Sequence, residues 1–270
     1  MQPPAELEKK IIRSGMINVS VSNLYDEPSY GSELISQGIL GEQVEILKHH
    51  QPFTRIRQMD GYESWISSEQ VVLGVVPEGR RIMVRSHFMR IYREPSISSE
   101  SVRDVVIGSV LLAEGEEKEW VRIVLPDMTA GWAEKRHFGT FPEFSVESIT
   151  ALAREFLGYQ YAWGGRSPKG FDCSGFVQTI FNLHGVAISR DAEQQQRSHI
   201  YSTDYCKAEA ADLLFFGKSA GYVTHVAISL GNQRFIHASG WIRCNSLNKT
   251  DRDFSEHHQQ TSISVNRYGH

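Results

Sequence analysis

The sequence has few cysteines and no marked excess of charge of either sign. Its 270 residues include three cysteines, and 28 lysines and arginines against 32 acidic residues give a net charge of −4. Three widely spaced cysteines without a Cys-x-x-Cys pair exclude a disulfide framework and a cysteine-rich zinc site. The balanced charge excludes a strongly basic nucleic-acid binder. We expect no nucleic-acid partner, no cofactor and no metal.

Long hydrophobic runs are also missing. Apolar stretches such as 71–76 and Leu213–Phe216 are far shorter than the ~20 residues of a membrane-spanning helix. The first residues, MQPPAELEKKIIRSG, lack the apolar stretch of a signal peptide. We therefore expect a cytoplasmic protein without a membrane span, and a monomer. A periplasmic or exported protein is the alternative if a signal was removed from the sequence.

A repeat divides the chain. Shifted by 67 residues, the segment 16–66 aligns with 83–133 without a gap, and LYDEPS in the first copy falls on IYREPS in the second. Each copy alternates apolar and polar residues between turn signals, which is typical of small antiparallel barrels. The strand order and the internal glycine resemble bacterial SH3 domains. We predict two such barrels, at 13–75 and 76–140.

From Phe144 onward the pattern becomes α+β. Ser145 is the expected N-cap of a helix whose apolar residues recur at helical spacing up to Phe156. Gly158 is expected to end this helix. A second helix follows the glycine-rich loop YQYAWGGRSPKG, and the strand-like segments ADLLFF, THVAISL and RFIHAS come after it. We predict a third, α+β domain at 144–270.

Cys173 is the candidate nucleophile. It stands between a glycine-rich loop and an amphipathic helix, and a helix N-terminus favours the thiolate and offers N–H groups to an oxyanion. Core filler is the alternative. Cys206 and Cys244 lack this setting, so we interpret both as packing residues.

His225 and His237 are the candidate partners of this cysteine. If their strands form a hairpin, an odd-length loop such as Gly231–Gln233 places Ala227 opposite His237 and both histidines on one face. A two-residue turn would put them on opposite faces. On one face, His225 can act as the general base for Cys173 while His237 orients its imidazole, an arrangement that cleaves or transfers acyl groups.

The segments FDCSGF, RDAEQQ, THVAISLG and FIHAS together resemble the NlpC-type cysteine peptidases of bacterial cell-wall metabolism, which implies a papain-like domain. With the two SH3-like modules, the chain further resembles the three-domain γ-D-glutamyl-L-diamino acid endopeptidases. That resemblance implies hydrolysis of the γ-D-glutamyl–diamino acid bond in murein peptides with a free N-terminal L-alanine, in cell-wall peptide recycling or turnover.

The resemblance also assigns roles to residues. It implies a nucleophile, a base and a third polar residue at Cys173, His225 and His237. Tyr161 matches a tyrosine near the oxyanion and substrate, and Asp172 and Ser174 match substrate-contacting neighbours of the cysteine.

In related three-domain enzymes the first SH3-like module closes the cleft with an acid and a tyrosine, which we assign to Glu42 and Tyr62. The second copy has Ser109 and Thr129 at these positions, so neither is a shared scaffold residue. A carboxylate and a phenol suit the ammonium group of a free L-alanine. A solvated glutamate and a half-buried tyrosine are the alternative.

Three further features fit less simply. Asp191 could contact the substrate or brace Arg190. Ala192 stands where related sequences often carry serine, so one substrate hydrogen bond is expected to be missing. The paired histidines of SEHHQQ lack the spacing of a metal site, and we expect a surface loop.

Two other functions fit the same residues. An acyltransferase or amidase could use the same Cys-His-His site, because a covalent acyl-enzyme is common to these reactions. A wall-binding module with an inactive catalytic domain is the other alternative.

Overall fold

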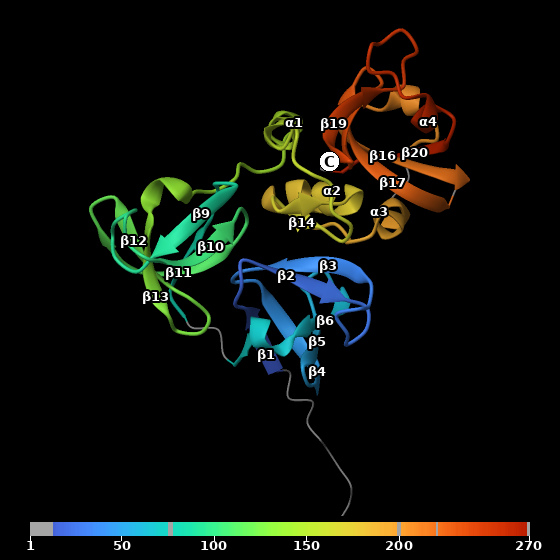
Figure 1. The fold of residues 1–270 in the computed structure, drawn as a ribbon. Helices are drawn as coiled ribbons and strands as arrows, with labels where there is room; N and C mark the ends of the chain where they lie inside the picture. Colours follow the sequence, from blue (N-terminus) through green and yellow to red (C-terminus); the bar gives the residue numbers. More distant parts are fainter. Residues whose placement is uncertain (1–12, 75–77, 199–200, 220, 269–270) are drawn as a thin grey trace, which may run out of the picture.

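The structure is a computed structural model that describes residues 13–74, 78–198, 201–219 and 221–268 (Figure 1). The other residues include the junction predicted between the first two domains and the last residues of the third; those parts of the predicted domains lie outside the described residues. Within the described part of the chain, no helix has both the length and the apolar character needed to cross a membrane.

The first β module is an antiparallel sheet with the strand order β3-β2-β6-β5-β4-β1-β7. Alternate residues of its strands point into a core that includes Leu24, Ile56 and Ile66, as the period-two pattern predicts. Its elements are β1 (Arg13–Ile17), β2 (Val21–Tyr25), β3 (Leu34–Ile39), β4 (Gln43–His50), β5 (Phe53–Arg57), β6 (Glu63–Ser67), the short helix η1 (Ser68–Gln70) and β7 (Val71–Leu73).

The second β module repeats the first. Its sheet has the equivalent order β10-β9-β13-β12-β11-β8, and each of these strands begins 67 residues after its counterpart. The duplication predicted from the sequence is therefore confirmed. The elements are β8 (Arg80–Met83), β9 (Phe88–Tyr92), β10 (Ser101–Val106), β11 (Val110–Glu117), β12 (Trp120–Val124), β13 (Ala130–Glu134) and the short helix η2 (Lys135–His137).

The third domain packs two helices on an antiparallel sheet with the order β19-β18-β17-β16-β20. The helices come first in the chain and the sheet follows, as predicted. The elements are α1 (Val146–Glu155), β14 (Arg166–Ser167), β15 (Gly170–Phe171), α2 (Cys173–Leu183), α3 (Ala192–Ser198), η3 (Tyr205–Lys207), β16 (Ala210–Ser219), β17 (Tyr222–Gly231), β18 (Arg234–Ser239), β19 (Trp241–Ser246), α4 (Glu256–Gln259) and β20 (Ser262–Asn266).

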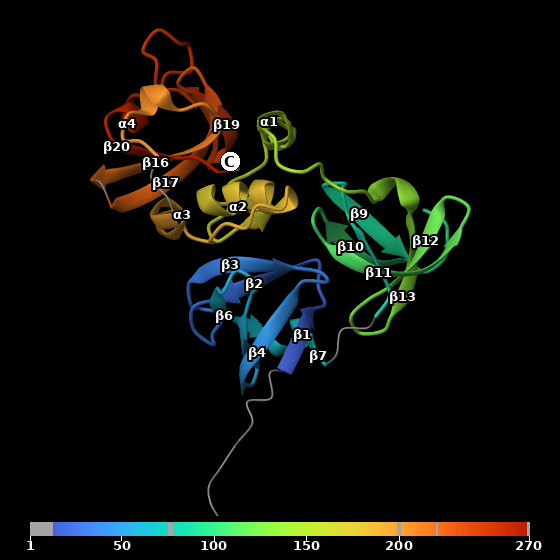
Figure 2. The same cartoon turned by 180° about the vertical axis from the view of Figure 1, so that it is seen from behind.

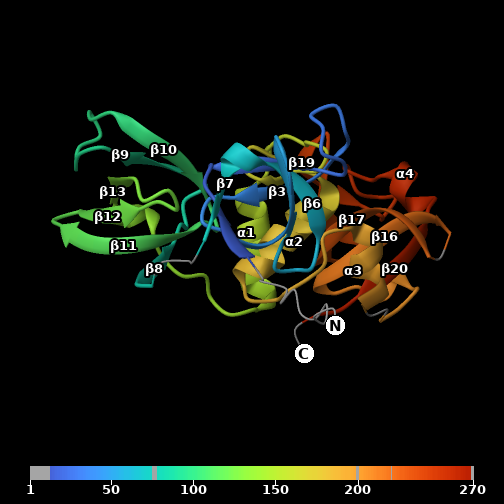
Figure 3. The same cartoon turned by 90° about the horizontal axis from the view of Figure 1, so that it is seen from below.

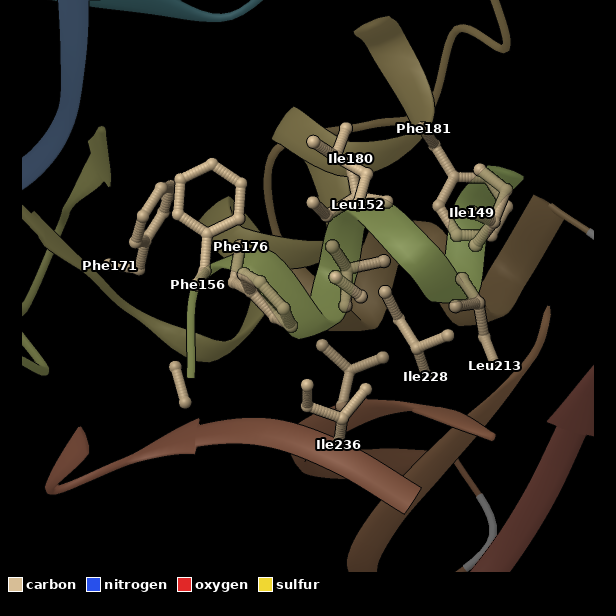
Figure 4. Packing of buried hydrophobic residues seen from close by; sticks show 14 of the residues in the cluster. Ile149, Leu152, Phe156, Phe171, Phe176, Ile180, Phe181, Leu213, Ile228 and Ile236 are labelled. Carbon is tan, nitrogen blue, oxygen red and sulfur yellow. The ribbon is translucent and has the colours of Figure 1, made fainter. Parts of the chain in front are cut away.

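A tight apolar core fixes α1 and α2 against this sheet. Ser145 caps α1, because its hydroxyl accepts from Ser148 N–H while the Ser148 hydroxyl accepts from Ser145 N–H. Ile149 of α1, Ile180 of α2 and Ile236 of β18 are completely buried in the same cluster (Figure 4). Burying such side chains stabilises each by about 1.5–3 kcal/mol, so the start of α2 is held rigidly relative to the sheet.

The repeat also explains how the three units are joined. Leu40 of the first module is part of the core of the second, and its equivalent in the second module, Ile107, is part of the core of the third domain. The same position of the repeat thus inserts into the next unit each time. Views from behind and from below show the first module against α2 with the second module beside it (Figures 2 and 3).

Candidate active site

Cys173 is the first residue of α2 and lines a cavity of about 390 Å³ between the third domain and the first β module. Asp172 precedes it as the N-cap, and its Oδ1 accepts from Gly175 N–H at 2.6 Å. Gly175 is required here, because a Cβ at this position would lie 2.2 Å from the carbonyl oxygen of Gly165. The motif Asp-Cys-Ser-Gly therefore places the thiol at the helix start, as predicted.

The thiol is nevertheless not acidified. Burial and the neighbouring Asp172 carboxylate raise the pKa of Cys173 to about 11, although the backbone N–H groups of Val226 and Ser174 lower it. The N–H groups at the helix start favour the thiolate, as predicted, but desolvation outweighs them. Cys173 needs a base to become a nucleophile.

The two predicted histidines lie on one face of the sheet, although the loop that joins their strands differs from the predicted one. Ile228 pairs with Ile236 in the hairpin of β17 and β18, and this register places Ala227 opposite His237. The turn has two residues, Asn232 and Gln233, both with positive φ. A bulge between Ser229 and Gly231 shifts the register by one residue. The extra residue of the bulge has the same effect as the three-residue loop that we expected, because it places both histidines on one face of the sheet.

His225 and His237 are directly hydrogen-bonded, with His225 Nε2 and His237 Nδ1 2.7 Å apart. His225 lines the cavity of Cys173, whereas His237 is completely buried behind it. Burial lowers the pKa of His225 well below its usual value and that of His237 to about 3. Both imidazoles are therefore neutral near pH 7, and His225 is available as a proton acceptor.

A third histidine, which the sequence analysis placed in a surface loop, packs against this pair. His258 lies in helix α4 and is only 7% exposed, so that expectation is wrong. Its ring stands 5.3 Å from that of His225 and 5.0 Å from that of His237. The tail folds inward because His258 also packs on the rings of Phe216 and Phe235.

These three histidines could hold a metal ion, since one nitrogen of each lies within 4.8 Å of the others. Their nitrogens are engaged differently, however. His225 and His237 bond to each other, and His258 Nδ1 bonds to the Ser255 hydroxyl at 2.7 Å. His225 Nε2 and His237 Nδ1 are thus engaged with each other, and we treat this pair as a hydrogen-bonded relay.

Arg190 is the buried centre of the cavity wall. Its guanidinium forms a bidentate pair with the Asp172 carboxylate and donates to the Ser174 hydroxyl at 2.9 Å. It also donates from Nε to the Ser36 hydroxyl of the first module at 3.0 Å. Asp172 and Ser174, predicted to contact substrate, line the cavity and are held in place by Arg190.

The first module contributes Tyr62 and Glu33 to the same cavity. The Tyr62 hydroxyl donates to Asp191 Oδ1 at 3.3 Å, and Trp163 Nε1 donates to Glu33 Oε1 at 3.1 Å. Burial, together with the Asp191 charge, raises the pKa of Tyr62, and burial raises that of Asp191 despite nearby Arg190. Two acidic groups, Glu33 and Asp191, therefore line the cavity where the first module meets the third domain.

Glu42 does not reach this cavity. Its Oε2 accepts from Arg166 Nη2 and from Ile39 N–H, both at 3.1 Å, and its Oε1 accepts from Gln58 at 2.8 Å. Glu42 therefore anchors the first module to the third domain. The assignment of Glu42 as the acid of the cleft is not supported by its position; Glu33, which the sequence analysis did not select, occupies that place.

The remaining predicted residues have varied surroundings. Tyr161 lines the cavity, and burial raises its pKa to about 12, so its hydroxyl stays protonated as a hydrogen-bond donor. Cys244 packs against the core as expected. Cys206 is exposed in η3, so its interpretation as a packing residue is wrong. Ala192 also lines the cavity, with no hydroxyl to offer a substrate.

Comparison with known proteins relates two segments of the chain, one in the first β module and one in the third domain, to known families. Residues 158–260 match the NlpC/P60 family, and residues 24–71 match the bacterial dipeptidyl-peptidase Sh3 domain. A γ-D-glutamyl-L-lysine dipeptidyl-peptidase of Bacillus cereus is 29% identical over 81% of this chain and 68% of that protein. Dipeptidyl-peptidase 6 of Lysinibacillus sphaericus is 25% identical over 95% of this chain and 98% of that protein.

The fold is shared with a solved structure. The crystal structure of an NlpC/P60 family protein from Bacillus cereus matches with a TM-score of 0.80 at 22% identity. The match covers 94% of this chain and 99% of that one. The arrangement of a strand-rich N-terminal region before the domain that carries Cys173 is therefore common to both.

Proposed function

Because the chain belongs to the NlpC/P60 family of cysteine peptidases, we propose that it hydrolyses the γ-D-glutamyl–diamino acid bond of murein peptides with a free N-terminal L-alanine. The observation that carries this proposal is the wall that the first module adds to the cavity of Cys173, through Glu33, Ile35 and Tyr62. This wall limits the length of chain that can lie on the N-terminal side of the scissile bond. The name of the Bacillus cereus relative, a γ-D-glutamyl-L-lysine dipeptidyl-peptidase, supports the same bond.

The reaction uses the neutral thiol of Cys173 and the neutral imidazole of His225, which line the same cavity. Cys173 Sγ attacks the γ-carbonyl carbon of D-glutamate as its proton moves to His225, and the C–N bond breaks when His225 returns that proton to the leaving amine. Water then hydrolyses the thioester, with His225 taking and returning a proton again. The Tyr161 hydroxyl and the N–H groups of the first turn of α2 would hold the oxyanion.

The free α-ammonium group is recognised at the module boundary. Glu33 and Asp191 supply negative charge to this part of the cavity, and Tyr62 of the first module bonds to Asp191 of the third domain. A bound ammonium would favour the ionised form of the Asp191 carboxyl, whose pKa is raised by burial. An N-acylated peptide has no such charge and adds bulk against this wall.

We expect Glu33→Gln to lower kcat/KM for L-Ala-γ-D-Glu-L-Lys by about 10–100-fold, as expected for one lost hydrogen bond to a charged group. The same change should leave kcat/KM for the N-acetylated peptide nearly unaltered. Glu100→Gln is the matched control, because Glu100 is the equivalent residue of the second module and pairs with Arg93 at the surface. Equal losses of Glu33→Gln on both peptides would contradict an amine-binding role.

We also infer that both β modules are SH3-like barrels and that the third domain is papain-like. The equivalent strand orders of the two modules support the first inference. A nucleophile at the start of a helix, packed against an antiparallel sheet that carries the base, supports the second.

A further inference from the structure

Asn245 lies behind the buried histidine of the active site. It is on β19, where Phe235 pairs with Asn245 and His237 pairs with Arg243. Side chains at alternate positions share a face of a sheet, so Asn245 lies diagonally beside His237. His237 Nε2 and Asn245 Oδ1 are 3.0 Å apart.

The orientation of the Asn245 amide is fixed by its second contact. Its Nδ2 donates to the carbonyl oxygen of Asp253 at 2.9 Å. A carbonyl oxygen can only accept, so the NH₂ group must face Asp253 and the Oδ1 atom must face His237. Asn245 therefore presents a pure acceptor to His237.

This acceptor determines where both histidines carry their protons. His237 Nε2 must carry a proton to bond to Oδ1, so the Nδ1 atom of neutral His237 is an acceptor. His225 Nε2, 2.7 Å away, must then donate to it. In neutral His225 the remaining nitrogen, Nδ1, is consequently unprotonated and able to accept a proton.

We propose that Asn245 is a positioning residue of the active site, which fixes the tautomers of His237 and His225 and so keeps His225 Nδ1 ready to take the Cys173 proton. This inference rests on the proposed function of Cys173 and His225. During attack, the thiol proton moves to His225 Nδ1 and the resulting imidazolium donates through Nε2 to His237 Nδ1. The same proton leaves with the amine of the diamino acid.

Without Asn245, the tautomers of His237 and His225 are no longer fixed. Neutral His237 could then carry its proton on Nδ1 and accept on Nε2, which would present a donor to His225 Nε2. The proton of His225 would move to Nδ1, and His225 could then no longer accept the thiol proton at that atom. The other charged or titratable groups around the pair, Arg243, His257 and His258, lower the pKa of His225, whereas the Asn245 contact raises that of His237.

Two substitutions separate this role from a structural one. Asn245→Leu and Asn245→Asp both remove the bond to Asp253, but only aspartate keeps an acceptor toward His237. We expect Asn245→Leu to lower kcat about 100-fold with KM within about twofold of the wild type, in line with the loss of general-base catalysis. Asn245→Asp should keep kcat within about tenfold.

The pH profile provides the second readout. The added carboxylate of Asn245→Asp stabilises the imidazolium, so the acid limb of kcat/KM should move to higher pH than in the wild type. If Asn245 merely braces the Asp253 segment, the two variants would lose activity equally and the acid limb would not move. That result would overturn the proposal.

The tautomers can be read without substrate. In ¹⁵N NMR of the wild-type protein above pH 6.5, both His225 and His237 should show a protonated Nε2 and an unprotonated Nδ1. Asn245→Leu should lose this signature at His237, whereas Asn245→Asp should keep it. A protonated His237 Nδ1 in the wild type would overturn the proposal even if the peptidase activity is found. Absence of that activity with the expected tautomers would instead contradict the proposed function.

Discussion

Replacing Cys173 by alanine should lower kcat/KM on murein peptides by about 10⁴-fold or more, because the covalent route through the thioester is lost. Cys206→Ser and Cys244→Ser are the matched controls. Cys206 is exposed in η3, and Cys244 lies on β19 and packs against the core. Neither lines the cavity, so both variants should retain activity. Residual activity of Cys173→Ala near the wild-type level would contradict the assignment of the nucleophile.

The state of the same thiol can be measured directly. With a pKa of about 11, Cys173 should be alkylated by iodoacetamide at a rate that rises up to pH 10 and above. A resting thiolate–imidazolium pair would instead react at a constant rate from mildly acidic pH upward. Peptide mass analysis distinguishes Cys173 from the exposed Cys206.

Replacing Arg190 by methionine should destabilise the protein by about 3–5 kcal/mol, the usual result of leaving one partner of a buried ion pair uncompensated. Arg190 and Asp172 have side chains only 1% and 10% exposed, and Arg190 also bonds to Ser36 of the first module. Activity should fall as well, because Asp172 caps the helix that begins with Cys173. Calorimetry and peptide hydrolysis measure the two effects.

Two comparisons make this prediction specific. Arg57→Met removes a surface ion-pair partner of Glu45 and Glu63, and should change stability little, because exposed pairs contribute little. Adding Asp172→Asn to Arg190→Met removes the unpaired charge but keeps an acceptor for the helix cap, so part of the stability should return. A calorimetric profile of Arg190→Met like that of Arg57→Met would contradict the account.

The repeat and the order of helices and sheet could be predicted from the sequence, because both are local patterns. Residues 16–66 and 83–133 align without a gap, and the period-two alternation within them depends on neighbours along the chain. Cys173 at a helix start could be predicted for the same reason, since Asp172 and Gly175 form the cap locally. The pKa of the thiol could not, because burial depends on the whole cavity.

Glu33 could not be selected by comparing the two copies of the repeat, because that comparison points to positions at which the copies carry different residues. Glu33 is matched by Glu100 in the second module, and so resembles a scaffold residue. Its partners differ instead: Glu100 pairs with Arg93, whereas the equivalent of Arg93 in the first module is Asp26. Glu33 therefore lacks that arginine and meets Trp163 of the third domain. The change from Arg93 to Asp26 at this neighbouring position is the feature of the sequence that could have indicated a different role for Glu33.

The histidine cluster depends on contacts between distant segments. A bulge at Leu230 could not be inferred from the sequence, yet it determines which face His225 occupies. His258 lies 19 residues after Ser239, the last residue of β18, and its burial depends on the rings of Phe216 and Phe235. Asn245 becomes informative only when the pairing of β18 with β19 is known.

The most direct test of the central claim compares L-Ala-γ-D-Glu-L-Lys with its N-acetylated form, using the wild-type protein and mass analysis of the products. The account predicts release of lysine and the dipeptide L-Ala-γ-D-Glu from the free peptide, with the acetylated form cleaved at least about tenfold more slowly, as one lost charged hydrogen bond implies. Cleavage of both peptides at equal rates, or cleavage only at another bond, would contradict it.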